Sequence, residues 1–191
     1  MNKKSIMIDM DDVIVVCRFK EFLKEFLGDI DFENNQNYYL QDYIKGREEE
    51  FKKRYKYQNL YKYNNGEYVE PLPSCVDVIK KLNEKYDVYI VTTFVWKHDV
   101  IDAATNLKNK FEYLNYWFPF IDSNKFIFMT DKTKIQYDIG IDDRLLNLNS
   151  CNRKILFTDF RNKIISDEKL EKEGIKRANN WLEIQEELCD I

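Results

Sequence analysis

Five short apolar runs, separated by helical or loop segments, constrain the fold of this 191-residue chain more than any other feature. They lie at residues 5–9, 87–93, 125–130, 137–143 and 154–158. Short, nearly continuous apolar runs are typical of strands that are buried on both faces. Parallel strands need crossover connections, which the intervening segments can supply. We therefore expect an α/β fold in which helices cover both faces of a parallel sheet.

Several of the intervening segments have helical periodicity. In residues 18–28, apolar residues recur at spacings of three and four before a glycine, which predicts a helix. Ser74 and Asp77 resemble a capping box and predict a second helix that runs through Leu82. Two further helices are expected over 98–117 and 179–188.

Residues 29–70 differ in character from the rest of the chain. They are strongly charged, rich in tyrosine and without a clear strand pattern. A structureless loop of this length is unusual in a compact α/β fold. Together with the helix before it, the segment predicts a small helical cap subdomain at residues 18–70, inserted after the first strand. Residues 1–17 and 71–191 are expected to form the core.

Composition and charge disfavour several classes of protein. A formal net charge of −4 argues against binding polymeric nucleic acid through a basic surface. The start of the chain resembles a signal peptide, but Asp9, Asp11 and Asp12 interrupt its apolar run. No stretch has the length and apolarity of a membrane span. The four cysteines include no CxxC pair, which is typical of reduced thiols. We expect a soluble, cytoplasmic protein without a membrane partner.

Polar side chains stand where the predicted strands end. In chain order they are Asp9 and Asp11, Thr92 and Thr93, Lys132 or Lys134, and Asp142 and Asp143. Parallel strands present their carboxyl ends at one edge of the sheet, and ligands of open α/β sheets bind at that edge. These groups should therefore converge on one cleft.

Four carboxylates in one cleft could not all stay ionised unaided, so either protons or a cation must compensate them. Two like charges about 4 Å apart repel by roughly 4 kcal/mol at an effective dielectric constant of about 20. Mg²⁺ binds carboxylate, phosphate and water oxygens, so it would supply the compensating charge. Lysine and threonine side chains would donate hydrogen bonds to phosphoryl oxygens, and a carboxylate can attack phosphorus to form an aspartyl-phosphate. The sequence thus predicts a phosphoryl-transfer site.

The order of these motifs resembles that of the haloacid dehalogenase (HAD) superfamily of phosphatases, in which Asp-x-Asp precedes threonine, lysine and Asp-Asp. The likeness narrows to the 5'(3')-deoxyribonucleotidase family and spans about residues 5–188. It rests on the stretches DMDDV, EPLPSCVDVIKKL, VYIVTT, DKT, DIGIDDR, ILFT and NNW. The resemblance implies a Rossmann-like core, Mg²⁺ as cofactor, and hydrolysis of nucleoside 5'-monophosphates, deoxyribonucleotides in particular.

The resemblance also implies catalytic roles for individual residues. Asp9 would be the nucleophile. Asp11 would protonate the leaving oxygen and then activate the water that hydrolyses the phosphoenzyme. Thr92 and Thr93 would bind the phosphoryl group, and Lys132 would hold phosphate and nucleophile together.

The metal site follows from the same resemblance. Asp143 would bind Mg²⁺ together with Asp9 and the backbone carbonyl of Asp11. Asp142 would support these ligands or replace one of them.

Some positions depart from the family pattern or concern the substrate pocket. Asp12 stands where the family usually has glycine, and Cys17 stands where it places a phenylalanine against the base. Tyr38, Tyr39 and Leu40 fall near the aromatic wall of the family's pocket. These residues are the candidates for contact with a nucleobase.

Other functions stay open at this point. A phosphatase of the same fold could act on another small ester, such as a sugar phosphate. A non-catalytic binding protein is disfavoured because Asp9 and Asp11 are both present. A signalling receiver domain is disfavoured by motif order, because its paired acids come first. The expected partner is a small nucleoside monophosphate, and a homodimer is left open.

Overall fold

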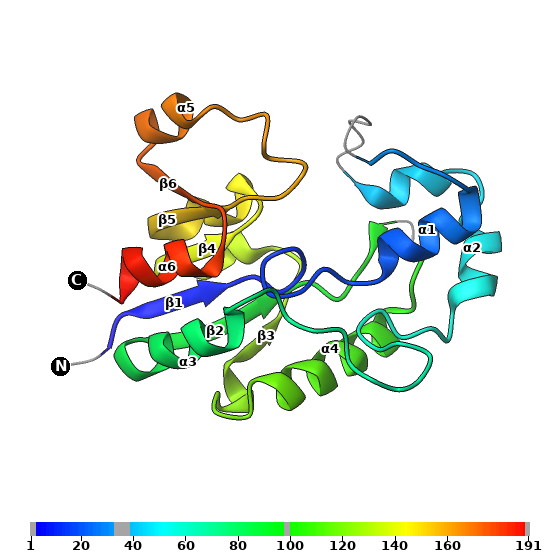
Figure 1. Cartoon of the computed structure of the whole chain (residues 1–191), viewed down its shortest axis with the longest axis horizontal. Coiled ribbons are helices and arrows are strands. Elements are labelled where there is room, and N and C mark those ends of the chain that lie inside the picture. Colours follow the sequence, from blue (N-terminus) through cyan, green and yellow to red (C-terminus); the bar gives the residue numbers. More distant parts are fainter. Residues whose placement is uncertain (1–2, 33–38, 98–99, 190–191) are drawn as a thin grey trace.

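A computed structural model describes residues 3–32, 39–97 and 100–189 of the chain. Within these residues the strands are β1 (Ser5–Ile8), β2 (Asp87–Thr92), β3 (Phe126–Phe128), β4 (Tyr137–Asp142), β5 (Cys151–Phe157) and β6 (Ile175–Ala178). They form one parallel sheet in the order β3-β2-β1-β4-β5-β6 (Figure 1). The chain runs outward from β1 to β3 and then crosses back to β4 on the other side of β1. The expected Rossmann-like α/β class is confirmed, with its switch point between β1 and β4.

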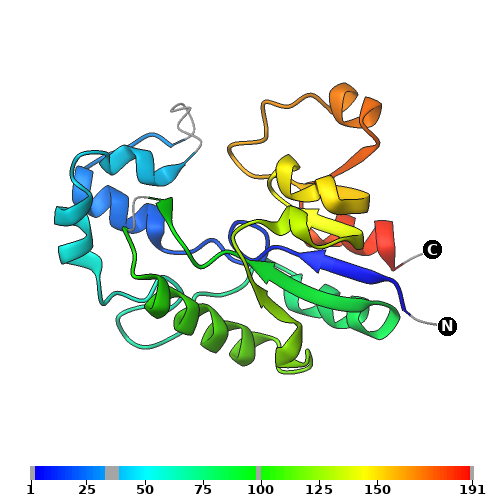
Figure 2. The same cartoon turned by 180° about the vertical axis from the view of Figure 1, so that it is seen from behind.

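The helices differ in which part of the molecule they cover. They are α1 (Phe19–Leu27), α2 (Glu48–Tyr55), α3 (Cys75–Lys85), α4 (Ala103–Trp117), α5 (Asp167–Lys172) and α6 (Trp181–Leu188). Short 3-10 helices are η1 (Leu40–Ile44), η3 (Ser123–Lys125), η4 (Lys132–Lys134) and η5 (Leu145–Ser150). Helices α3 and α6 lie side by side on one face of the sheet (Figures 1 and 2). Among the described helices, none combines the length and apolarity needed to cross a membrane.

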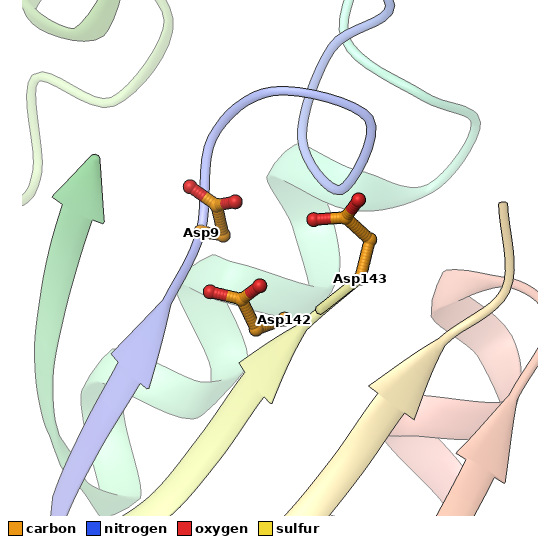
Figure 3. A group of neighbouring side chains, drawn as sticks. All are labelled: Asp9, Asp142 and Asp143. Carbon is orange, nitrogen blue, oxygen red and sulfur yellow. The ribbon is translucent and has the colours of Figure 1, made fainter. Parts of the chain in front are cut away.

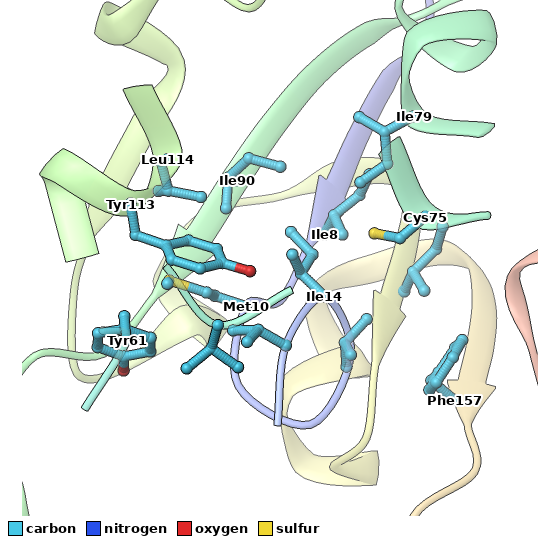
Figure 4. Close-up of a cluster of buried hydrophobic side chains, with 14 of the residues drawn as sticks. Ile8, Met10, Ile14, Tyr61, Cys75, Ile79, Ile90, Tyr113, Leu114 and Phe157 are labelled. Carbon is cyan, nitrogen blue, oxygen red and sulfur yellow. The ribbon is translucent and has the colours of Figure 1, made fainter. Parts of the chain in front are cut away.

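The two faces of the sheet carry separate apolar clusters, because successive side chains of a strand point to opposite sides. Ile8 belongs to the larger cluster, with Ile79 of α3 and Leu114 of α4 (Figure 4). Met7 belongs to the second cluster, with Leu148 of η5 and residues of β4, β5 and α5. The central strand is therefore buried on both faces, as its sequence predicts.

Helices α1 and α2 and the 3-10 helix η1 lie together beyond the carboxyl end of β1, away from the sheet (Figure 1). Aromatic pairs join the two α-helices. Phe19 lies 5.5 Å from Phe51 between ring centroids, and Phe22 stacks on Tyr55 at 4.8 Å. Buried rings at these positions give the inserted segment an apolar interior that adjoins the main core.

The structure confirms that α3 begins directly after Ser74 but corrects its predicted cap, and it corrects the predicted start of α4. The capping box at Ser74 is wrong: this residue has φ +63° and makes no side-chain hydrogen bond to α3. A capping serine needs extended backbone to reach the first N–H groups, and the left-handed conformation prevents this. Helix α4 begins at Ala103 instead of residue 98, because the Asp102 carboxylate accepts a hydrogen bond from the Thr105 N–H at 2.7 Å.

The sequence prediction also missed α5 and β6. Strand β6 has only four residues, and two of them, Lys176 and Arg177, are charged. It is a strand because it pairs in register with β5, from Lys154–Ile175 to Phe157–Ala178. Tertiary pairing thus overrides a weak local signal.

Candidate active site

Three buried carboxylates meet at the carboxyl ends of β1 and β4 (Figure 3). Asp9 directly follows β1, Asp142 ends β4, and Asp143 follows it. Oxygen atoms from the three carboxylates all lie within 4.8 Å of one another. The two strands are neighbours, and the Asp9 N–H donates to the carbonyl of Ile141 at 2.9 Å. Parallel register therefore brings together motifs that lie far apart in the sequence.

Lys132 lies between two of these carboxylates. Its Nζ is 2.6 Å from Asp9 Oδ1 and 2.7 Å from Asp142 Oδ2. Burial alone would lower the pKa of Lys132, but attraction to Asp142 and Asp9 outweighs it and raises the pKa. The rival candidate, Lys134, is largely exposed and lies 3.6 Å from the exposed Asp131. Of the two lysines, the structure brings Lys132 into the acidic group.

The acidic group favours a bound cation. Burial raises the pKa of Asp9 and raises that of Asp143 well above its ordinary value, and the charge of Asp142 adds to both shifts. Lys132 lowers the pKa of Asp9 but does not cancel the shift. Three clustered carboxylates make a set of hard oxygen donors, the set that Mg²⁺ prefers. The residues present therefore fit a divalent cation with oxygen ligands.

Asp142 is more fully hydrogen-bonded than its neighbour. Its Oδ2 accepts from Lys132 and its Oδ1 from the Arg144 N–H at 2.9 Å. The Asn147 amide donates to both oxygens, at 3.0 and 3.1 Å. Asp143 Oδ2 accepts from Arg161 at 2.8 Å. These contacts leave Asp143 with more capacity for a metal than Asp142.

Arg161 lies among a second group of carboxylates beside the first, formed by Asp12, Asp143 and Asp159. Its Nη2 lies 2.5 Å from Asp12 Oδ2 and 2.8 Å from Asp143 Oδ2, and its Nε lies 2.7 Å from Asp159 Oδ2. Asp12 has φ +62°, a conformation that glycine adopts freely and aspartate tolerates better than most residues. Asp12 stands where the family that the sequence resembles usually has glycine. The guanidinium of Arg161 compensates the negative charge that Asp12 adds.

Asp11 is held by two buried side chains that the sequence analysis did not single out. The Tyr61 hydroxyl donates to Asp11 Oδ1 at 2.8 Å, and Lys110 Nζ donates to Oδ2 at 2.5 Å. Lys110 also donates to Thr92 Oγ1 at 2.6 Å. Burial, reinforced by the charge of Asp11, raises the pKa of Tyr61 well above its ordinary value, so its hydroxyl stays protonated.

A cleft of about 150 Å³ lies over these groups. Its lining includes the predicted residues Asp9, Asp11, Asp143, Thr93, Cys17, Tyr39 and Leu40. Thr92 is buried beneath it and contacts Lys110, while Tyr38 lies outside the described residues. Apart from Tyr38, the structure therefore brings the predicted candidates to this cleft or to the layer directly below it.

Aromatic and cationic side chains line the same cleft. Phe19 and Trp96 lie 4.4 Å apart between ring centroids. Lys97 Nζ lies 4.5 Å from the Tyr39 ring centroid, and Arg144 donates to the Tyr39 hydroxyl at 3.2 Å. Such walls suit a flat, polar ligand. Phe19 itself has no exposed surface and belongs to the apolar core, as its place in the helical pattern predicts.

Comparisons with known proteins agree with this arrangement. The family model described as "5' nucleotidase, deoxy (Pyrimidine), cytosolic type C protein" matches residues 3–189. A Staphylococcus aureus protein provisionally named a 5'(3')-deoxyribonucleotidase is 32% identical over 124 residues, which cover 64% of this chain and 62% of that protein. A 5'(3')-deoxyribonucleotidase from Bacillus subtilis is 36% identical over 112 residues, 58% of each chain. The matches thus span less than two thirds of these relatives.

Solved structures share the fold. One of them, the provisionally named HAD-hydrolase YfnB from Bacillus subtilis, determined bound to magnesium, has a TM-score of 0.50 and 15% identity. The match covers 99% of this chain and 100% of that one. At this identity the likeness concerns the fold alone.

Proposed function

The chain belongs to the family described as 5' nucleotidase, deoxy (pyrimidine), cytosolic type C, and from this membership we propose that it is a Mg²⁺-dependent phosphatase of nucleoside 5'-monophosphates, preferably deoxyribonucleotides. The observation that carries the proposal is that Asp9 and Asp143, whose carboxylates meet, line one cleft together with Asp11, while Lys132 contacts Asp9. The description of the family names a cytosolic type, and we extend the proposal to a cytoplasmic location.

In the first half of the reaction, Asp9 attacks phosphorus. Its Oδ1 accepts hydrogen bonds from Lys132 and from the Met10 N–H, each at 2.6 Å. None of the described residues donates to Oδ2, which supports this oxygen as the attacking atom. As the bond from Oδ2 to phosphorus forms, the bond from phosphorus to the nucleoside O5' breaks. Asp11, protonated at this stage, gives its proton to O5', and the free nucleoside leaves.

In the second half, water hydrolyses the aspartyl-phosphate. Asp11, now a carboxylate, takes a proton from the water as its oxygen attacks phosphorus. The bond from phosphorus to Asp9 breaks, which releases inorganic phosphate and restores the carboxylate. Thr92, Thr93 and Lys132 bind the phosphoryl oxygens throughout.

Asp9, Asp143 and the backbone carbonyl of Asp11 are the proposed Mg²⁺ ligands. The hydrogen bonds of Asp142 support a role in which this carboxylate positions the ligands and Lys132 without being a main ligand itself. When bound, Mg²⁺ supplies positive charge against the negative charge that develops on the phosphoryl group.

Residues 18–70 act as the cap that selects the substrate, and residues 1–17 and 71–191 form the catalytic core. The proposed base pocket includes Cys17, Tyr39 and Leu40, all of which line the cleft. Tyr38, also proposed for this pocket from the sequence, lies outside the described residues.

Replacement of Tyr39 by alanine should raise KM for a nucleoside monophosphate by about one to two orders of magnitude. Stacking of a base on an aromatic ring contributes about 1–3 kcal/mol per base in nucleic-acid sites. KM for p-nitrophenyl phosphate should change little, since this ester has no base. Tyr57, an 86% exposed tyrosine of the same insert, provides the matched control in Tyr57→Ala. Equal changes for both esters would remove Tyr39 from the base pocket.

Phosphate release across a panel of esters tests the proposed function. The panel contains ribo- and deoxyribonucleoside 5'-monophosphates of each base, the corresponding 3'-monophosphates and several sugar phosphates, all assayed with Mg²⁺. The highest kcat/KM is expected for a deoxyribonucleoside monophosphate. A sugar phosphate as the best substrate would replace the nucleotide assignment, and no release from any ester would refute the enzymatic function.

A further inference from the structure

Lys110 is a fully buried lysine that reaches the candidate active site from α4. None of its surface is exposed, and its Nζ lies 2.5 Å from Asp11 Oδ2 and 2.6 Å from Thr92 Oγ1. A buried ammonium is strongly unfavourable unless a charged partner and hydrogen bonds compensate it. Asp11 supplies that charge as a carboxylate, and Oδ2 can still accept from Lys110 when the carboxyl group carries the proton that it gives to O5'. The contact therefore ties the proposed acid to the proposed phosphate-binding threonine through one side chain.

The chemistry of the ammonium group determines which way the Thr92 hydroxyl donates. A lysine ammonium has three donors and no acceptor, so Thr92 Oγ1 must accept in this contact. The hydroxyl hydrogen of Thr92 is then directed away from Lys110. In the structure it is directed at the Thr93 carbonyl oxygen, 3.4 Å from Thr92 Oγ1, a long contact that a phosphoryl oxygen above β2 can replace.

Tyr61 fixes the other oxygen of Asp11. Its hydroxyl donates to Oδ1 at 2.8 Å, and its fully buried ring lies 5.5 Å from the ring of Tyr113 between centroids. Tyr61 belongs to the segment between α2 and α3, whereas Lys110 belongs to a helix of the core. Two donors from separate elements thus set the orientation of one carboxylate, whose oxygens each keep further acceptor capacity.

We propose that Lys110 and Tyr61 are positioning residues: they hold the Asp11 carboxyl group where it can protonate the leaving oxygen, and Lys110 also aims the Thr92 hydroxyl at the phosphoryl group. This inference rests on the proposed phosphatase function. It assigns each residue a distinct effect, because Tyr61 acts through Asp11 alone and Lys110 acts through both Asp11 and Thr92.

Esters with different leaving groups distinguish a loss of acid positioning from a general structural defect. A nucleoside leaves as a strongly basic alkoxide unless Asp11 protonates it, whereas p-nitrophenolate leaves readily without a proton. The value of kcat/KM reports the steps up to departure of the leaving group. The second half of the reaction, which all substrates share, does not enter it.

For Tyr61→Phe we expect kcat/KM on a nucleoside monophosphate to fall about 10-fold or more, with a change of less than about 3-fold on p-nitrophenyl phosphate. Lys110→Met should lower it by about 100-fold on the nucleotide and about 10-fold on the aryl ester, and Lys110→Arg should restore part of the loss. Tyr113→Phe is the matched control, because it removes a buried hydroxyl that has no hydrogen-bond partner among the described residues. It should leave both kcat/KM values unchanged.

Each other outcome overturns a defined part of the account. Equal losses on both esters in Tyr61→Phe, or no loss on either, would refute the positioning role. So would a loss in Tyr113→Phe that matches Tyr61→Phe. A wild-type protein that hydrolyses only a different alkyl phosphate would refute the nucleotide assignment alone, and the comparison would then use that ester. A wild-type protein that hydrolyses neither class would refute both proposals.

Discussion

Asp9→Asn should lower kcat for nucleoside monophosphates by about three orders of magnitude or more while leaving the fold intact. An amide is too weak a nucleophile to form the phosphorylated intermediate, so the main reaction path is lost. Asparagine keeps the shape of the side chain, and its carbonyl oxygen can still accept from Lys132. The measurement is steady-state phosphate release, with circular dichroism melting to verify folding.

Asp138, an aspartate of the same sheet outside the site, provides the control variant. Asp138 lies near the start of β4, where it accepts hydrogen bonds from the Ser5 N–H and hydroxyl, at the opposite end of the strand from the site. Asp138→Asn should keep nearly full activity. If folded Asp9→Asn protein retained more than about a tenth of wild-type kcat, Asp9 would not be the nucleophile.

Removal of Mg²⁺ should have the second-largest effect. Exhaustive chelation with EDTA should lower phosphate release by about three orders of magnitude, and added Mg²⁺ should restore it. The physical reason is the charge balance at Asp9, Asp142 and Asp143, three buried carboxylates that Lys132 and Arg161 only partly compensate, since Arg161 also pairs with Asp12 and Asp159. Without a cation, negative charge would accumulate further as the phosphoryl group transfers.

Binding of the ion can also be measured without turnover. A ligand present at 100 times its Kd stabilises a protein by about 2.7 kcal/mol, which corresponds to a rise in Tm of roughly 5–10 °C for a chain of this size. Wild-type protein should show such a rise with Mg²⁺, and Asp143→Asn should lose most of it. Asp138→Asn should retain the full rise. Full activity after chelation, or a wild-type Tm that Mg²⁺ does not change, would rule out the proposed metal site.

The part of the site that the sequence predicts consists of residues at strand ends. Asp9, Thr92 and Asp142 each follow or end a short apolar run, and their convergence follows from parallel pairing of neighbouring strands. These signals are local in the sequence, and knowledge of the fold class is enough to place the residues together in space. For this reason the sequence alone is enough to identify them.

The supporting residues could not be found in this way, because tertiary packing alone brings them to the site. Tyr61 is 50 positions from Asp11 along the chain, and Lys110 is 99 positions from it. Arg161 is 149 positions from Asp12. Each lies in a segment whose composition suits ordinary packing or a solvated loop. A buried, paired charge is visible only in three dimensions.

The same distinction explains the errors in the fold prediction. The capping box at Ser74 was read from residue types, but backbone conformation decides whether a side chain can cap a helix. Strand β6 was missed because its pairing with β5 determines its structure. Helix periodicity did identify α1 and the face through which Phe19 packs into the core.

The most direct test of the account is to identify the phosphorylated residue. Reaction with a nucleoside monophosphate is quenched within the first turnover, treated with borohydride to reduce an acyl phosphate to a stable alcohol, and digested for peptide mass spectrometry. The account predicts homoserine at Asp9 in wild-type protein and none in Asp9→Asn. Reduction at a different carboxylate, or rapid phosphate release without reduction at any residue, would contradict it.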